Sequence, residues 1–213
     1  MEFKIAETNE TKPLAPDNFK EIKPETSLSP EDAKQSWNDF FKNDVTTEPG
    51  EHFHTSREDR ISWAETSDGD WSGEPGNSEF TPTDKTESGL AVTDTLNKNG
   101  VKGIEFKDGV PDFSPLAVET VSIDMTSDRT ENYARAYSAL AEKWNAECKD
   151  GRTDWTARDA KDWKVANHLS PHECNDMKTV MFVPMDVHDF VKHWGGVAEC
   201  KARDNALGGG FDE

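Results

Sequence analysis

The sequence is poor in apolar residues, which fill 33% of its 213 positions, against roughly 45–50% (glycine included) in ordinary globular chains. With so few apolar residues, not every segment can pack into a hydrophobic core. We therefore predict one folded part and one loosely packed part. No run approaches the ~18 consecutive apolar residues of a transmembrane helix. Residues 1–7 (MEFKIAE) contain no apolar stretch typical of a cleavable signal peptide. Neither membrane insertion nor export by a general signal peptide is therefore expected.

Basic residues are also scarce, with 24 Lys and Arg against 43 Asp and Glu, a net charge of -19. This balance argues against a passive nucleic-acid binder, because neutralising phosphates requires a Lys/Arg surface. It does not exclude an enzyme that grips the backbone through a metal ion and a few local cations. The three cysteines, Cys148, Cys174 and Cys200, are odd in number and form no CxxC pair. Free thiols are expected, rather than a disulfide framework or a zinc ribbon.

The composition divides the chain near residue 65. Prolines interrupt residues 1–65 every few positions, and only one helix is predicted there, beginning at Ser29-Pro30. Residues 71–78 (WSGEPGNS) indicate a turn-rich loop. A short helix from about Leu90 should stop at Asn99-Gly100.

From residue 101 onward the pattern is that of an α+β fold. We predict strands over 103–107 and 118–123, a helix over 129–144 and another around 155–165. The last unit, residues 171–196, indicates a strand end, a tight turn at Asn175-Asp176, an apolar strand closed by Pro184, and a brief helix closed by Gly195-Gly196. This order is β-β-α within about 25 residues.

Four of the six histidines fall in this C-terminal stretch: His168, His172, His188 and His193. A ββα unit with a histidine on its first strand and two at its helix suits one divalent metal ion, because neutral imidazoles bind such ions well and a carboxylate such as Glu173 adds charge. The ion can stabilise the charge that builds during P–O cleavage, and an unligated histidine can take a proton from water.

The spacing of two of these histidines sets a condition. His188 and His193 are five residues apart, which places them about 140° apart on a regular helix. They can converge only if the helix ends near Lys192. Asp189 and His193 share a helix face without such a bend, so Asp189 is a competing ligand.

Three ordered elements resemble the HNH/endonuclease VII-type toxin nucleases of bacterial polymorphic toxins (the WHH/WHE-like group). Residues 177–184 (MKTVMFVP), followed by His188 and residues 193–196 (HWGG), are similar to the family's terminal histidine motif. Upstream, residues 71–78 are similar to its WxGExGNS element, and residues 103–114 (GIEFKDGVPDFS) to its GIxYK(N/D)GxPDFS element. The chain departs from the family at Pro171, where the family has Trp, and at Lys192, where it has Gly.

The resemblance implies an α+β fold with a ββα-metal (His-Me finger) nuclease core at about 168–196, accessory helices and a loosely structured N-terminal segment. Residues 66–213 would form the nuclease domain, and residues 1–65 an acidic, Pro-rich leader or delivery segment. His172 would be the general base, His188, His193 and Glu173 the ligands of one divalent ion (Mg, Mn, Zn or Ni), and Lys178 and Lys192 the cations that contact DNA.

The implied function is a metal-dependent DNA endonuclease toxin used in bacterial competition. Its expected partners are the DNA substrate, an immunity protein, and a secretion carrier or chaperone at the N-terminal segment. It would be secreted, or delivered into the target-cell cytoplasm, without a cleavable signal peptide. Two alternatives remain open: an inactive acidic relative that binds a protein, suggested by the -19 charge and Pro171, and an RNase on the same scaffold.

Overall fold

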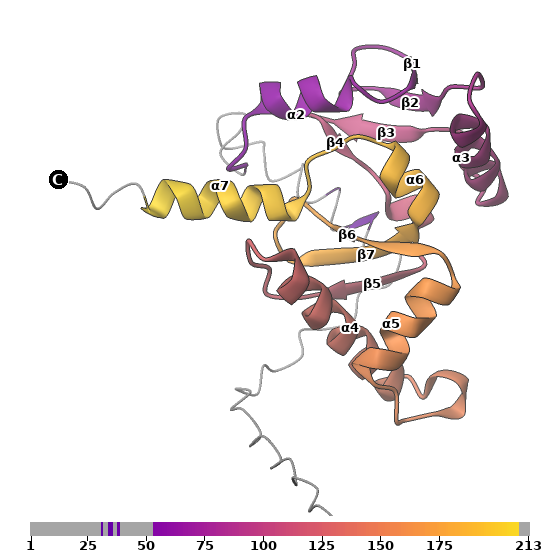
Figure 1. Cartoon of the computed structure of the whole chain (residues 1–213), viewed down its shortest axis with the longest axis vertical. Helices are drawn as coiled ribbons and strands as arrows, with labels where there is room; N and C mark the ends of the chain where they lie inside the picture. Colours follow the sequence, from indigo (N-terminus) through magenta and orange to yellow (C-terminus); the bar gives the residue numbers. More distant parts are fainter. Residues whose placement is uncertain (1–30, 32–33, 36–37, 39–52, 209–213) are drawn as a thin grey trace, which may run out of the picture.

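The computed structural model describes residues 31, 34, 35, 38 and 53–208, which form a mixed α+β structure with two small antiparallel sheets (Figure 1). None of the helices in these residues is long and apolar enough to cross a membrane. The predicted α+β class is confirmed. Residues 31, 34, 35 and 38 are helical, and the rest of the helix predicted after Ser29 lies outside the described residues.

The first sheet forms the upper part of the molecule in Figure 1 and has the order β1-β2-β3-β4. Its strands are β1 (Gly69–Trp71), β2 (Glu79–Pro82), β3 (Ile104–Lys107) and β4 (Val110–Pro111). The helices α2 (Arg57–Ala64) and α3 (Glu87–Lys98) pack against it. The loop predicted over 71–78 is confirmed for residues 72–78, but the sequence pattern missed β1 and β2, which are only three and four residues long.

The second sheet has the order β5-β7-β6, with β5 (Glu119–Ser122) and β6 (Leu169–Glu173) on either side of β7 (Thr179–Pro184). The helices α4 (Arg129–Ala146) and α5 (Ala157–Ala166) pack together at its lower side (Figure 1). After β7 come α6 (Met185–Phe190) and α7 (Gly196–Gly208), and α7 projects away from both sheets. Short 3-10 turns lie at Ser114–Leu116 and Lys149–Gly151.

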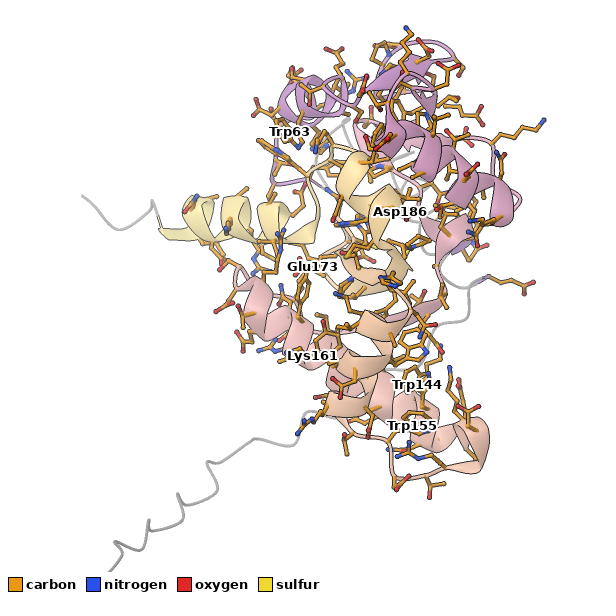
Figure 2. The ribbon with its side chains drawn as sticks, turned by 45° about the vertical axis from the view of Figure 1, so that its right-hand side comes forward. Trp63, Trp144, Trp155, Lys161, Glu173 and Asp186 are labelled. Atoms are coloured by element: carbon orange, nitrogen blue, oxygen red, sulfur yellow. The ribbon has the colours of Figure 1, made fainter. Side chains whose placement is uncertain are left out.

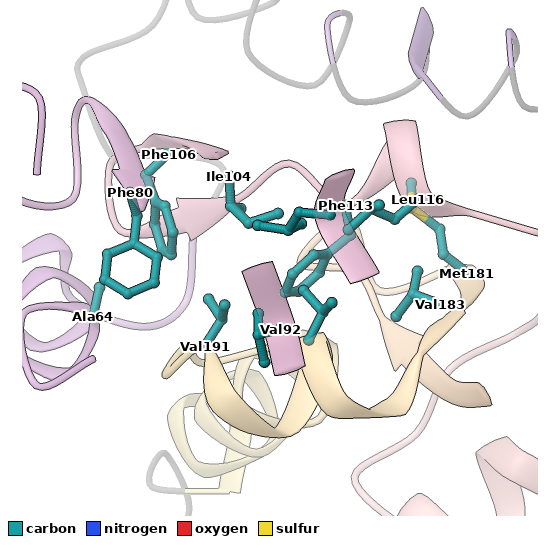
Figure 3. Packing of buried hydrophobic residues seen from close by; sticks show 12 residues of the cluster. Ala64, Phe80, Val92, Ile104, Phe106, Phe113, Leu116, Met181, Val183 and Val191 are labelled. Atoms are coloured by element: carbon teal, nitrogen blue, oxygen red, sulfur yellow. The ribbon is translucent and has the colours of Figure 1, made fainter. Parts of the chain in front are cut away.

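The central strand β7 is buried on both faces, and its alternating side chains supply two separate cores. Met181 and Val183 join the core shared with the first sheet, which Figure 3 shows. Val180 and Phe182 join the core beneath α4 and α5. This double burial explains why the strand is a continuous apolar run. The predicted strand over 177–184 is therefore confirmed, beginning at Thr179.

The helix boundaries follow local capping chemistry. Asp128 caps α4 by accepting from the N–H groups of Thr130 and Glu131, and Thr156 caps α5 with a reciprocal bond to Asp159. α3 ends at Lys98 with Asn99 as its C-cap, and Gly100 follows with a φ of 71°. The predicted ends of α3 and α4 are thus confirmed to within a few residues. All three cysteines are free, as expected.

The helix α2 lies inside the segment expected to be a leader, and it packs against the later chain. The buried Arg60 donates to the carbonyl of Asp108 in the β3–β4 turn, and Ala64 is fully buried in the first core. The Thr55 side chain donates to the buried Glu199 of α7, which also accepts from the N–H groups of His54 and Thr55. These contacts attach residues 54–64 to the first sheet and to α7.

Candidate metal centre

Three histidines from three different segments meet on one side of β6. His172 comes from β6, His188 from α6 and His193 from the loop after α6. Their ring centroids are 5.5 Å apart for His172 and His188, 4.9 Å for His172 and His193, and 5.0 Å for His188 and His193. One nitrogen of each ring lies within 4.8 Å of the other two. The predicted gathering of these imidazoles is present, with His172 as a full member of the group.

The two histidines after β7 converge because α6 ends early. The helix stops at Phe190, and Val191 is extended with φ -79° and ψ 114°. His193 therefore leaves the helical path and turns back over His188, as the spacing required. The double glycine has a different role from the one predicted, because Gly196 begins α7 instead of closing α6.

The double glycine permits a close approach between two chain segments. A Cβ on Gly195 would lie 2.6 Å from the backbone oxygen of Glu173, and one on Gly196 would collide with the backbone oxygen of Cys174. The loop at 193–196 can thus press against the end of β6 only because both positions lack a side chain. The packing of this loop against β6 places His193 next to His172.

A single aromatic ring packs against all three imidazoles. The ring centroid of Phe113 lies 4.8 Å from that of His172, 6.0 Å from that of His188 and 5.3 Å from that of His193. Phe113 is 1% exposed and belongs to the first core (Figure 3). Its predecessor Asp112 accepts from the backbone N–H and the hydroxyl of Ser114, and it pairs with Lys34. Residues 111–114 (PDFS), through Phe113, thus form the floor of the histidine group.

The hydrogen bonds of the rings leave nitrogen lone pairs facing inward. Nδ1 of His193 lies 2.8 Å from the carbonyl of Val191, and Nδ1 of His188 lies 3.3 Å from the carboxylate of Asp189. Both partners are acceptors, so we assign the proton to Nδ1 in each ring, which leaves Nε2 free as a ligand atom. Asp189 itself is directed at His188 rather than taking part in the three-nitrogen group.

One pair of nitrogens in the group has the spacing expected of two ligands of one small divalent ion. Nε2 of His193 and Nδ1 of His172 are 3.2 Å apart. Two imidazole ligands at about 2.0–2.1 Å from a tetrahedral zinc ion would be separated by roughly 3.3–3.4 Å. The donor set, three neutral imidazoles with a carboxylate beside one of them, suits Zn²⁺, Ni²⁺ or a similar ion.

Burial keeps these imidazoles neutral. It lowers the pKa of His172 well below its usual 6.5, and the neighbouring His193 and His188 act in the same direction. Burial, with a further contribution from His188, lowers the pKa of His193 to about 3. Burial also lowers the pKa of His188, although the bond to Asp189 opposes the shift. At neutral pH each ring is therefore uncharged, with a proton on one nitrogen and a lone pair on the other.

The carboxylate of Glu173 is engaged outside the histidine group. One oxygen accepts from Nε of Arg129 at 3.1 Å, and the other accepts from Nδ2 of Asn132 at 2.7 Å. The side chain is buried, and burial raises the pKa of Glu173, although the bonds to Asn132 and Arg129 oppose the shift. Glu173 thus lies beside the three imidazoles without joining them.

A cavity of about 210 Å³ opens onto the histidines. That volume equals about seven water molecules at roughly 30 Å³ each, enough for an ion with a phosphate group. The side chains that line it beyond the three histidines include Trp63, Arg129, Tyr133, Glu173, Asp189 and Lys192. Of the two cations predicted from the sequence, Lys192 lines the cavity, whereas Lys178 lies in the β6–β7 turn and does not.

Sequence reasoning missed Arg129, Asn132 and Tyr133. All three lie on the first turns of α4, at the spacing of three and four residues that places side chains on one helix face. The sequence spacing shows that these three side chains share one helix face. It does not show that this face is directed toward β6. Burial and the charge of Glu173 raise the pKa of Tyr133 to about 12, so its hydroxyl stays protonated.

The other residues considered from the sequence lie apart from the group. His168 is exposed and has a φ of 52° just before β6. Cys174 follows Glu173, and burial raises the pKa of its thiol well above the usual 9.0, so it is not a thiolate. His54 takes part in the contact with Glu199 through its backbone, and His52 lies outside the described residues.

The fold and site thus define a mixed α+β protein with a cation-lined pocket over three histidines. Residues 103–195 match the family described as the DNase/tRNase domain of colicin-like bacteriocin. The matched segment runs from just before β3 to Gly195 and contains Phe113 and all three histidines. The match supports a toxin nuclease domain, and hence a hydrolase, in this part of the chain. The comparison with curated proteins gives no match.

Proposed function

We propose that this protein is a metal-dependent endonuclease toxin that hydrolyses phosphodiester bonds of DNA on a ββα-metal core of the HNH type. The observation that carries the proposal is the meeting of His172, His188 and His193 beside a cavity lined by Arg129 and Lys192. The strands β6 and β7 and the helix α6 follow one another in the order that such a core requires. The family match to colicin-like nucleases supports the same reading.

In this proposal His172, His188 and His193 hold one divalent ion. A bound ion of this kind would act as a Lewis acid on a phosphate oxygen and stabilise the charge of the transition state. The hydrogen bonds from His193 to Val191 and from His188 to Asp189 orient two of the ligands. Phe113 keeps all three rings in place by packing against them.

The geometry favours exchanging the roles expected for His172 and Glu173. His172 faces His193 across 3.2 Å, which suits a ligand better than an unligated base. Glu173 lines the same cavity, and Arg129 and Asn132 hold its carboxylate in one orientation. A carboxylate so placed can accept a proton from the attacking water.

Two cations are placed to hold the substrate. Arg129 is 62% exposed at its side chain and lines the cavity while its Nε contacts Glu173. The Nζ of Lys192 lies 3.2 Å from the carbonyl of Asp189, at the same cavity. A guanidinium and an ammonium at one small pocket suit the two non-bridging oxygens of a single phosphodiester.

The biological setting that we propose follows from the toxin class. Such a domain would be delivered into a target cell, and the producing cell would need an immunity protein. Residues 1–65 would include the segment that a secretion carrier or chaperone recognises. The family description covers both DNase and tRNase domains, so an RNase on the same scaffold is the second candidate.

The test is cleavage of supercoiled plasmid by the purified protein with Mg²⁺, Mn²⁺, Zn²⁺ or Ni²⁺ in turn, and with EDTA. We expect nicking with at least one ion, and no nicking by His188→Ala or His193→Ala. His168→Asn is the matched control, because His168 is exposed with a positive φ that Asn tolerates. Intact plasmid with all four ions contradicts the proposal.

Two further measurements separate the alternatives. Calorimetric titration with the same ions should show binding of one ion per chain, whereas an inactive relative that has lost the site would bind none. Comparison of tRNA with plasmid as substrate separates an RNase from a DNase.

A further inference from the structure

One large apolar side chain lies exposed at the rim of the candidate metal centre. Trp63 of α2 is 44% exposed, yet it lines the same cavity as the three histidines, Arg129 and Lys192. It lies above Glu173 in Figure 2. Trp63 is outside the matched segment 103–195, so the family match assigns it no role.

The position of Trp63 is fixed by tertiary contacts. The adjacent Ala64 is fully buried in the first core. Three residues further on, the hydroxyl of Ser67 accepts from the backbone N–H of Lys192 at 2.9 Å, next to His193. The backbone N–H of Ser67 in turn donates to the carbonyl of Ala64 at 3.0 Å. The end of α2 is thus attached to the loop that carries a histidine of the site, and the indole is held at the cavity before any substrate arrives.

The charge of the chain limits how a nucleic acid can be held. With a net charge of -19, the protein cannot follow a long stretch of phosphate backbone with a basic surface. Among the described residues, the cations that line the cavity are Arg129 and Lys192, which suit one or two phosphates. Affinity for a nucleic acid must therefore come partly from contacts that do not depend on charge, and an aromatic face supplies one by stacking on a base.

We propose that Trp63 stacks on an unpaired base next to the scissile phosphate, so that the site prefers single-stranded nucleic acid to continuous duplex. In a duplex each base is already stacked on both faces, and exposing one face to Trp63 costs unstacking and unpairing energy. In a single strand the face is available at little cost. This inference rests on the proposed nuclease function, and it adds the substrate class and the residue that selects it.

The test compares a fluorescent single-stranded 12-mer with the same sequence as a duplex, by anisotropy in EDTA, so that binding is measured without cleavage. We expect wild-type protein to bind the single strand more tightly. Trp63→Ala should weaken single-strand binding by at least about fivefold, the lower end of base–aromatic stacking, and change duplex binding by less than about twofold. Trp63→Phe should retain most of the affinity, because it keeps an aromatic face.

The salt dependence separates stacking from charge. Two phosphate contacts on a single strand predict a slope of about -1.4 for log K against log salt concentration. Trp63→Ala should lower the affinity and leave this slope unchanged, whereas Arg129→Gln should reduce its magnitude by about 0.7. Val165→Ala, an exposed apolar residue of α5 away from the cavity, is the control and should change neither.

The outcomes distinguish this inference from the proposed function. If Trp63→Ala cleaves single strands with an unchanged KM and binds them as wild type does, the inference fails while the nuclease assignment stands. If the protein binds single strands through Trp63 but cuts nothing with any ion, the nuclease assignment fails while the stacking site stands. If Trp63→Ala weakens only the binding of an immunity protein, Trp63 belongs to a protein interface and the inference is overturned.

Discussion

Nε2 of His193 lies 3.2 Å from Nδ1 of His172, although the two residues belong to a loop and to a strand on opposite sides of β7 in the sequence. Two imidazole nitrogens so close can share one proton or hold one ion. Nδ1 of His193 already has an acceptor in Val191, so its Nε2 is a lone-pair donor. This relationship underlies the predictions for the metal centre.

The roles of His172 and Glu173 can be separated by measuring metal binding and rate independently. Glu173→Gln should bind the activating ion as wild type does and lose about 10²–10⁴-fold in cleavage rate, the usual contribution of a general base. His172→Ala should lose metal binding itself. If Glu173→Gln loses the ion and His172→Ala retains it, the two residues have the roles that the resemblance implied.

Replacing Phe113 should loosen the metal centre without touching a ligand. Phe113→Leu keeps an apolar side chain but removes the flat face against which the three rings pack. We expect roughly 10-fold weaker metal binding by calorimetry, the lower end for residues that support a ligand. Phe106→Leu, a change in the same core away from the rings, is the control. An equal loss of metal affinity in both variants would show that core stability alone is responsible.

Adding one methyl group to the glycine loop should displace His193. The Cβ of Gly195→Ala would lie 2.6 Å from the backbone oxygen of Glu173, so the loop must move. We expect a lower Tm, from overpacking that costs about 1–3 kcal/mol, together with weaker metal binding. Gly208→Ala is the matched control, because its added Cβ meets no atom within 4 Å. Unchanged metal binding in Gly195→Ala would contradict the role given to this contact.

Glu119 should make the fold sensitive to acid. Burial by itself raises the pKa of Glu119, but bonds from Lys143, Lys149 and the indole N–H of Trp144 outweigh it, and the net pKa is below 4.5. Because the pKa is lower in the folded state, the stabilisation is complete above about pH 4.5 and is lost as the pH falls through the folded value.

The corresponding measurement is urea unfolding of wild type and Glu119→Gln from pH 7 down to pH 3. We expect the variant to be less stable by roughly 2 kcal/mol at pH 7, because two lysines lose a charged partner. The difference should shrink as the pH falls below 4.5. A difference that stays constant over this range would contradict the assigned shift. Glu142→Gln, an exposed acid on the same helix as Lys143, is the control.

Local sequence signals predicted much of the second half of the fold. The helical spacing over residues 129–144 predicts α4, and Asn99-Gly100 predicts the end of α3. They missed β1 and β2, which are short and lie on either side of the turn-rich loop at 72–78. The predicted role of Gly195-Gly196 was wrong, because a glycine pair that ends a helix and one that permits close packing look the same in sequence.

For the site, the sequence determined which chemistry is available. The histidines near the carboxyl end, the apolar strand before them and the break required between His188 and His193 are all properties of neighbouring residues, and local backbone preferences act over that range. Only the tertiary structure decided which groups meet. His172 joins the other two rings, Glu173 turns to Arg129 and Asn132, Phe113 forms the floor, and Trp63 reaches the rim. These groups come from segments as far apart in the sequence as Trp63 and His193, and their pairing depends on how two cores pack on either side of β7, which no local pattern encodes.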